Sequence, residues 1–264
     1  MPALRRCRFA ATGDSLISRR LPEGDCDSRA IAELIGGADF RFTNLETVVR
    51  HWHEGFPSAQ SGGTWTSVTP EMLADLLTYG FNAIAWATNH TLDYSCGGLL
   101  ATERYLNAAG VVHAWAGATL AEASAVRYLE SRGGRVALIS ATSTFHESWV
   151  AGDPRADVPG RPGINPLRFS KLHLVSGERL RQLQGIAEES KINAEHNLAV
   201  QAGYAAPEPE GIVRFGNLLF REVRAGEKAG IVSHMSSKDW ERFRRSISES
   251  KAPERLRGGI HSLS

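Results

Sequence analysis

The feature that most constrains this fold is a pattern repeated in the first half of the chain, where short apolar runs end in polar residues. The clearest run, residues 80–87, is followed almost at once by Asn89, His90 and Asp93. Such runs are typical of buried strands, and the carboxyl ends of strands in an open α/β sheet border one crevice. Residues 7–12 and 38–43 end in the same way. The pattern therefore predicts a site at three strand ends, with the candidate residues Asp14, Asn44, Glu46, Asn89, His90 and Asp93.

Helical patterns alternate with these runs, as in a mostly parallel sheet covered by helices. The helix expected over residues 69–79 has Thr69 as its N-cap, Pro70 as its first residue and Gly80 as its end. Further helices are expected over residues 29–35, 99–109 and 119–125, and a hairpin over residues 126–130 and 135–140. We therefore predict an α/β fold, a layered sandwich of β-sheet flanked by helices.

The second half of the chain is less regular. Segments rich in Pro and Gly predict an irregular surface insertion over about residues 150–210. Helical patterns cover residues 178–202 and 237–251, and a pair of strands is expected over residues 211–223. Residues 1–251 are expected to form a single domain, and residues 252–264, which have little apolar periodicity, a disordered tail.

Composition disfavours several classes of protein. The chain carries 30 Lys and Arg against 29 Asp and Glu, so its net charge of +1 gives no general attraction for nucleic acid. No apolar run reaches the roughly 20 residues of a membrane span, and the first residues lack the pattern of a secretion signal. We therefore predict a cytoplasmic protein with no nucleic-acid partner and no membrane segment, in which Cys7, Cys26 and Cys96 are free thiols.

The candidate residues carry the chemistry of a divalent-metal site. Carboxylate oxygen, imidazole nitrogen and amide oxygen are ligands of Mn²⁺, Zn²⁺ or Mg²⁺. The five candidate ligands are Asp14, Asn44, Glu46, Asn89 and His90. Two ions, roughly 3.5–4 Å apart, can hold a phosphoester or carbonyl group and activate a water molecule. His90 could instead act as a general acid, with Asp93 fixing its tautomer as a catalytic partner, and spacing alone leaves both roles open.

Each of these residues also has a purely structural alternative. Asp14 suits a turn or a helix cap, Asn44 and Asn89 suit turns, and Asp93 suits the cap of the following helix. Their recurrence at three strand ends favours a site, because core packing gives no reason to repeat such residues.

The other histidines give weaker signals. His51 and His53 lie in a polar loop, where their spacing fits a solvated segment better than a metal site. His113 fits a structural position in a strand. His146 follows a strand among hydroxyl-bearing residues and is a reserve candidate for the site.

With these motifs in order, the sequence resembles the bacterial capsule-synthesis family of CapA type, which is associated with poly-γ-glutamate. The matching segments are Gly-Asp-Ser-Leu at 13–16, Asn-Leu-Glu-Thr at 44–47, and Asn-His-Thr-Leu-Asp-Tyr at 89–94, followed by Gly-Gly-Leu at 97–99. The resemblance covers most of residues 7–170 and, more loosely, the stretch to about 251. It implies a fold similar to that of the calcineurin-like metallophosphoesterases, with a two-metal site at the strand ends.

The resemblance also implies roles for individual residues. Asp14 and Glu46 would be metal ligands, Asn89 a bridging or phosphate-facing ligand, and His90 the acid or anion-stabilising group. Family members complete the site with later histidines, in a serine-x-histidine and a histidine-x-histidine segment, whereas this chain offers only Ile-His-Ser at 260–262. We therefore expect an incomplete fold from a chain truncated at its C-terminus, with too few metal ligands.

Two functional hypotheses remain. In the first, the protein acts in capsule or poly-γ-glutamate-type polymer metabolism, by metal-assisted hydrolysis or transfer at a phosphoester or amide of an anionic polymer or smaller substrate. In the second, it is a non-catalytic polymer-binding or scaffold module that keeps the fold without the metal centre. Nucleotide binding is disfavoured, because the glycine pair at 62–63 lacks the lysine and helix of a phosphate loop, and residues 13–15 do not continue as G-x-G-x-x-G.

Overall fold

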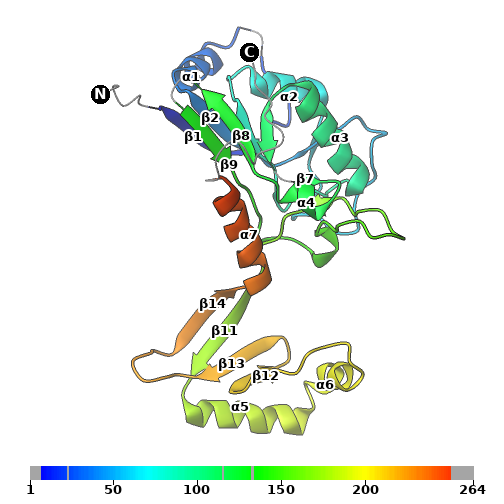
Figure 1. Ribbon diagram of the computed structural model, residues 1–264, viewed down its shortest axis with the longest axis vertical. Coiled ribbons are helices and arrows are strands. Elements are labelled where there is room, and N and C mark those ends of the chain that lie inside the picture. Colours follow the sequence, from blue (N-terminus) through cyan, green and yellow to red (C-terminus); the bar gives the residue numbers. More distant parts are fainter. Residues whose placement is uncertain (1–6, 23, 115, 132–133, 251–264) are drawn as a thin grey trace. The chain divides into compact units, whose positions relative to one another are not determined.

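The computed structural model describes residues 7–22, 24–114, 116–131 and 134–250 (Figure 1). Contacts within the chain divide it into two compact units. Unit 1 comprises Met1–Leu167 and Lys238–Ser264, and unit 2 comprises Arg168–Ser237. The single domain predicted for residues 1–251 stays a prediction, and the tail expected over 252–264, which includes His261, lies outside the described residues.

Unit 1 is built on a four-stranded sheet in the order β1-β2-β5-β6. Its strands are β1 (Phe9–Ser15), β2 (Phe40–Leu45), β5 (Ala83–Ala85) and β6 (Val112–Ala114). All three neighbouring pairs are parallel, so the chain must cross over between strands, and helices provide the crossovers. These helices are α1 (Cys26–Gly36), α2 (Pro70–Leu77) and α3 (Ser95–Ala108). The predicted α/β class, with sheet flanked by helices, is confirmed.

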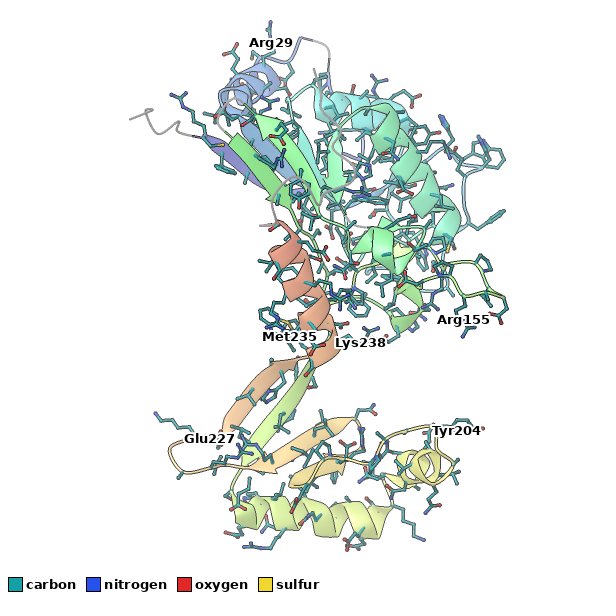
Figure 2. The ribbon with its side chains drawn as sticks, in the orientation of Figure 1. Arg29, Arg155, Tyr204, Glu227, Met235 and Lys238 are labelled. Carbon is teal, nitrogen blue, oxygen red and sulfur yellow. The ribbon has the colours of Figure 1, made fainter. Side chains whose placement is uncertain are left out.

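Shorter elements complete unit 1. They are β3 (Val48–Val49), β4 (Ser67–Val68), β7 (Ala116–Gly117), α4 (Leu120–Ala123), β8 (Arg127–Ser131), β9 (Gly134–Leu138), η1 (Glu147–Trp149), β10 (Gly163–Ile164) and α7 (Ser237–Ser250). β8 and β9 form the predicted antiparallel hairpin. Residues 152–161 form an irregular loop with Arg155 near its tip, as Figure 2 shows. The cysteines Cys7, Cys26 and Cys96 are free, as predicted.

Two apolar cores lie on opposite faces of the main sheet. Successive side chains of a strand alternate between faces, and Ala83 and the next residue, Ile84, belong to different cores. On one face Ile84 and Trp86 pack with residues of α2 and α3. On the other face Ala83 packs with Leu129 and Leu138 of the β8–β9 hairpin. The sheet therefore lies between a helical layer and a hairpin (Figure 1).

Unit 2 contains a four-stranded mixed sheet in the order β12-β13-β11-β14. Its elements are β11 (Phe169–Val175), α5 (Gly177–Ser190), α6 (Ala194–Gln201), β12 (Ile212–Phe215), β13 (Leu218–Glu222) and β14 (Gly230–Met235). The strand pair β12–β13 is the one predicted from the sequence. The single helix predicted over 178–202 is wrong, because Lys191 adopts a left-handed conformation with φ of 53° and separates α5 from α6.

No helix in the described part of the chain combines the length and the apolar character that a membrane span requires. The cytoplasmic location stays a prediction.

A buried imidazole links β6 to the end of β5. The indole Nε1–H of Trp86 donates to Nδ1 of His113 at 3.1 Å, and His113 Nε2 lies 3.0 Å from Asn107 Oδ1. Because an indole can only donate, Nδ1 must accept, and the proton of the neutral ring is on Nε2. Burial, with a smaller contribution from Arg127, lowers the pKa of His113 to about 4. His113 is therefore the structural residue that the sequence indicates.

We expect His113 to make the fold sensitive to acid. Its folded pKa of about 4 lies below the ordinary value of 6.5, so the unfolded chain takes up a proton that the folded chain does not. The free energy of unfolding should fall by about 3 kcal/mol as the pH drops from about 7 to 4. Urea unfolding of wild type and His113→Gln tests this: the variant should lose most of this pH slope, and the exposed control His146→Gln should keep it. Equal slopes in wild type and His113→Gln would contradict the assignment.

Candidate functional site

Two of the predicted residues lie inside strands rather than after them. β1 continues to Ser15 and β2 to Leu45. Asp14 and Asn44 therefore form the next-to-last residue pair between the two strands, instead of lying beyond the strands as predicted. A β-bulge between Ala11 and Asp14 shifts the register and sets Asp14 opposite Asn44. Bulges re-aim side chains at strand ends. The bulge therefore brings a carboxylate and an amide together at the carboxyl edge of the sheet.

Asn44 joins two carboxylates. Its amide Nδ2 donates to Oδ1 of Asp14 at 2.8 Å and to Oε2 of Glu46 at 2.7 Å. Burial raises the pKa of Glu46, and the nearby carboxylate of Asp14 raises it further, while His90 and the Asn44 hydrogen bond oppose the shift. The charges of Asp14 and His90 therefore both act on the Glu46 carboxyl group.

A row of hydroxyl groups supports the bulge. The buried Thr43 hydroxyl lies 2.8 Å from that of Thr12 and 2.6 Å from that of Ser15, and it donates to the carbonyl of Gly13 at 3.1 Å. None of these residues is among the candidates from the sequence. Their only signal there is that three hydroxyl-bearing residues lie within three positions of Asp14 and Asn44.

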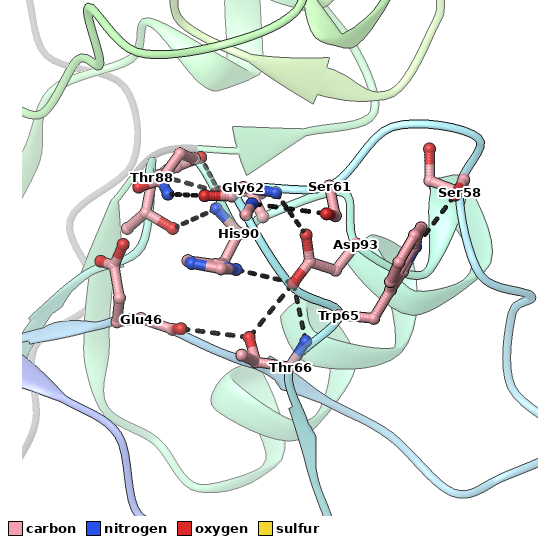
Figure 3. A network of polar contacts seen from close by, with 12 residues as sticks. Glu46, Ser58, Ser61, Gly62, Trp65, Thr66, Thr88, His90 and Asp93 are labelled. Carbon is pink, nitrogen blue, oxygen red and sulfur yellow. Dashed lines mark hydrogen bonds and ion pairs between the residues drawn. The ribbon is translucent and has the colours of Figure 1, made fainter.

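His90 and Asp93 form a hydrogen-bonded pair in the turn that follows β5. Nδ1 of His90 lies 2.7 Å from Oδ2 of Asp93, and the side chains are 12% and 0% exposed (Figure 3). The turn is closed by Thr91, whose hydroxyl accepts from the backbone of Thr88 at 2.8 Å and donates to the carbonyl of Trp86 at 2.7 Å. The spacing of three residues thus brings the imidazole and the carboxylate together, a contact that the sequence spacing allows.

Further donors surround the Asp93 carboxylate. The backbone N–H of Gly62 donates to Oδ1 at 3.1 Å, and the backbone N–H and hydroxyl of Thr66 donate to Oδ2 at 2.8 and 3.2 Å. An ionised carboxylate only accepts, so the shared proton of the pair is on His90 Nδ1. Nε2 of His90 has no hydrogen-bond partner among the described residues, and the ring lies between Asp93 and Glu46 (Figure 3). His90 therefore presents Nε2 to the site.

Asn89 is anchored by the same loop. Its amide Nδ2 donates to the carbonyl of Gly62 at 2.9 Å. A Cβ added at Gly62 would lie 2.4 Å from the Asn89 carbonyl oxygen, so only glycine fits there. Loop 58–66 is not among the candidates from the sequence, where its one signal is the glycine pair at 62–63, a weak phosphate-loop pattern without the lysine and helix.

The other candidate histidines take part in different contacts. His51 and His53 stack on one another with ring centroids 5.9 Å apart. His146 precedes η1, and its Nδ1 lies 2.7 Å from the hydroxyl of Ser148. Among the described residues, no group of three or more His, Cys, Asp or Glu side chains is gathered closely enough to hold a metal ion. The structure thus joins Asp14, Asn44 and Glu46 directly, and His90 to Asp93, without a fully formed metal cage.

Comparison with known proteins identifies the family. Residues 8–198 match the family described as bacterial capsule synthesis protein PGA_cap. The chain belongs to this family. Its relatives include the uncharacterized proteins y4sH and y4uA of Sinorhizobium fredii (strain NBRC 101917 / NGR234), each 38% identical over 184 residues.

The capsule-synthesis family match contains the whole candidate site, because Asp14 to Asp93 lie within residues 8–198. The sheet flanked by helices is consistent with the metallophosphoesterase-like α/β fold that the resemblance implies. The aligned stretch covers 68% of this chain but 40% of each relative. The chain therefore spans about two fifths of the length of these two curated relatives.

The close approach of Gly62 to Asn89 gives a test of the loop. We expect Gly62→Ala to lower the free energy of unfolding by about 1–3 kcal/mol, because the added methyl group meets backbone atoms that cannot turn away. Gly36→Ala is the matched control, since nothing lies within 4 Å of a Cβ at that position. Urea unfolding followed by tryptophan fluorescence measures both. Equal stability of the two variants would show that Gly62 is not tightly packed.

Proposed function

We propose that this capsule-synthesis family member acts on a polymer or its precursor by metal-assisted hydrolysis or transfer at a phosphoester or amide bond. The observation that carries the proposal is the convergence, at three parallel strand ends, of the joined carboxylates of Asp14 and Glu46 with the His90–Asp93 pair. Core packing does not require a buried carboxylate beside an imidazole, whereas such pairs are common in the active sites of hydrolytic enzymes.

The donor set fits a divalent cation. Glu46 is buried next to a second carboxylate, and this raises its pKa, an arrangement that a cation would relieve. Asp14, Asn44, Glu46, Asn89 and His90 would be the ligands, a mixture of oxygen and nitrogen that suits Mn²⁺ or Zn²⁺, and less closely Mg²⁺. A bound ion would polarise the scissile group and lower the pKa of a water molecule. Five donors serve one ion, and a second ion, which the resemblance implies, needs further ligands.

The other residues around the proposed cation position orient His90 and determine from which side substrate can enter. Asp93 holds the His90 ring through Nδ1, which leaves Nε2 to bind the cation. Exposure decreases from Asp14, which is exposed, through half-buried Asn44 and His90 to buried Asp93. Substrate therefore reaches the site from the Asp14 side, while Asp93 stays shielded from water.

We expect the wild-type chain to bind Mn²⁺ in calorimetry, and Asp14→Ala and His90→Ala to abolish measurable binding. Asp93→Asn should weaken binding by about 10–100-fold, because it acts only through the orientation of His90. Asp157→Ala is the control, since that carboxylate is exposed in the irregular loop of unit 1. In hydrolysis of bis-p-nitrophenyl phosphate or of γ-glutamyl p-nitroanilide, His90→Ala should abolish turnover, because the cation that activates the water is lost. Equal Mn²⁺ affinity in wild type and both alanine variants, with circular dichroism showing folded protein, would refute the metal site.

The second candidate function is a non-catalytic polymer-binding or scaffold module. It is favoured by the lack of a preformed metal cluster among the described residues. In that case calorimetry of folded protein detects no cation binding, and neither chromogenic substrate is turned over, while a capsule-type polymer still binds. The two functions are thus separated by the same set of measurements.

A further inference from the structure

Large aromatic side chains are exposed on the segment that leads into the candidate site. Trp52 is 86% exposed, Phe56 80% and Trp65 48%, and all three belong to residues 50–66, named here the aromatic loop. Exposed apolar side chains gathered on one segment are typical of a binding surface.

The backbone of the aromatic loop is firmly held while its rings face outward. Nη1 of Arg50 lies within hydrogen-bond distance of four loop carbonyls, those of His51, Trp52, Glu54 and Gly55. The Arg50 guanidinium also lies 3.8 Å from the centre of the Tyr94 ring. The Glu54 carboxylate accepts from the backbone of His51 at 2.7 Å and from Tyr105 of α3 at 3.0 Å, and it pairs with Arg104. The loop therefore presents its aromatic rings from an ordered backbone.

One of these rings, Trp52, begins a continuous row that includes two histidines and a tyrosine. Trp52 meets the edge of His53, His53 stacks on His51, and His51 meets the edge of Tyr105, each pair with centroids 5.9 Å apart. The row thus extends from an exposed indole to a ring anchored on α3.

The aromatic loop also borders the candidate site. Nε1 of Trp65 donates to the carbonyl of Ser58 at 2.9 Å, and the backbone N–H of Ser58 donates to the carbonyl of Asp93 at 2.8 Å. Thr66, which follows Trp65, donates to the Asp93 carboxylate. Figure 3 shows Trp65 beside Asp93 and Thr66. A ligand lying on this loop would therefore extend from the site.

Charge limits what that ligand can be. Apart from the histidines, only Arg50 and Glu54 are ionisable within residues 50–66, and both are used in the contacts that hold the loop. A polyanion such as nucleic acid or an acidic peptide gains its affinity from unpaired Lys and Arg, which the loop lacks. What remains exposed is aromatic face, imidazole nitrogen, and the side chains of Gln60 and Thr64, which carry an amide and a hydroxyl group.

We propose that the aromatic loop binds uncharged sugar rings of a glycan. The C–H face of a pyranose packs on an aromatic ring, and its hydroxyl groups pair with imidazole, hydroxyl and amide groups, which is the mixture present here. The inference rests on the proposed function in one respect: the bond cleaved at the candidate site is then the phosphoester or amide bond that joins a substituent to a sugar. The anionic part of the substrate belongs at the site, and its neutral rings on the loop.

An array of neutral oligosaccharides built from hexoses and N-acetylhexosamines tests this, with poly-γ-glutamate, polyphosphate and phosphatidylcholine vesicles as the competing classes. Binding is measured in EDTA by array fluorescence and by quenching of tryptophan emission, so the result does not depend on a cation or on turnover. We expect neutral glycans to bind, and Trp52→Ala and Phe56→Ala each to weaken binding at least tenfold. The control Tyr204→Ala, which removes a 90% exposed ring from unit 2 (Figure 2), should bind as wild type does.

The outcomes separate this inference from the proposed function. Loss of glycan binding in the two loop variants, with the control unchanged, supports it even if neither Mn²⁺ binding nor hydrolysis is found. The inference is overturned if no neutral glycan binds, if the loop variants bind as tightly as wild type, or if poly-γ-glutamate, polyphosphate or vesicles bind through Trp52 and Phe56 instead. Unfolding curves of both variants check that a loss of binding is not a loss of fold.

Discussion

The buried carboxylate of Asp93 is the interaction on which the candidate site depends. A carboxylate removed from water costs several kcal/mol unless new hydrogen bonds replace its hydration. Here the replacement comes from two segments far apart in sequence: Gly62 and Thr66 in the loop before β4, and His90 in the turn after β5. Neither segment could move without uncovering the charge. The orientation of the His90 ring is therefore a consequence of satisfying Asp93.

The residues of the site follow from a local pattern in the sequence, but most contacts between them do not. A buried run that ends in polar residues is visible in any short window around residues 80–94, and the spacing of His90 and Asp93 already allows them to meet. The bonds of Gly62 to Asp93 and to Asn89 span 31 and 27 residues. Such pairings depend on how the strands align. Local patterns carry no information on that alignment, so the bulge before Asp14 and the loop around Gly62 were not predicted.

Unit 2 shows the same limit at the level of whole strands. β12 and β13 are joined by a short turn at Gly216, where φ is +59°, and the hairpin was visible in the sequence. β11 and β14 pair with each other although all the other elements of unit 2 lie between them in the sequence. β14 is also exposed at most positions. An exposed strand lacks the apolar alternation that identifies strands in a sequence. The break at Lys191 was equally hidden, because a left-handed residue other than glycine has no local signature.

The aromatic loop carries both the exposed rings and the donors to the Asp93 carboxylate. Its first part, around Arg50, is fixed by hydrogen bonds to its own carbonyls, and its last part, at Gly62 and Thr66, binds the Asp93 carboxylate. One segment therefore both presents exposed rings and orients the imidazole. Contact with the rings would restrict the same backbone that positions Asp93, so a polymer bound there, as proposed, would also order His90. A separate binding domain could not provide this coupling, because its attachment would leave the donors to Asp93 unchanged.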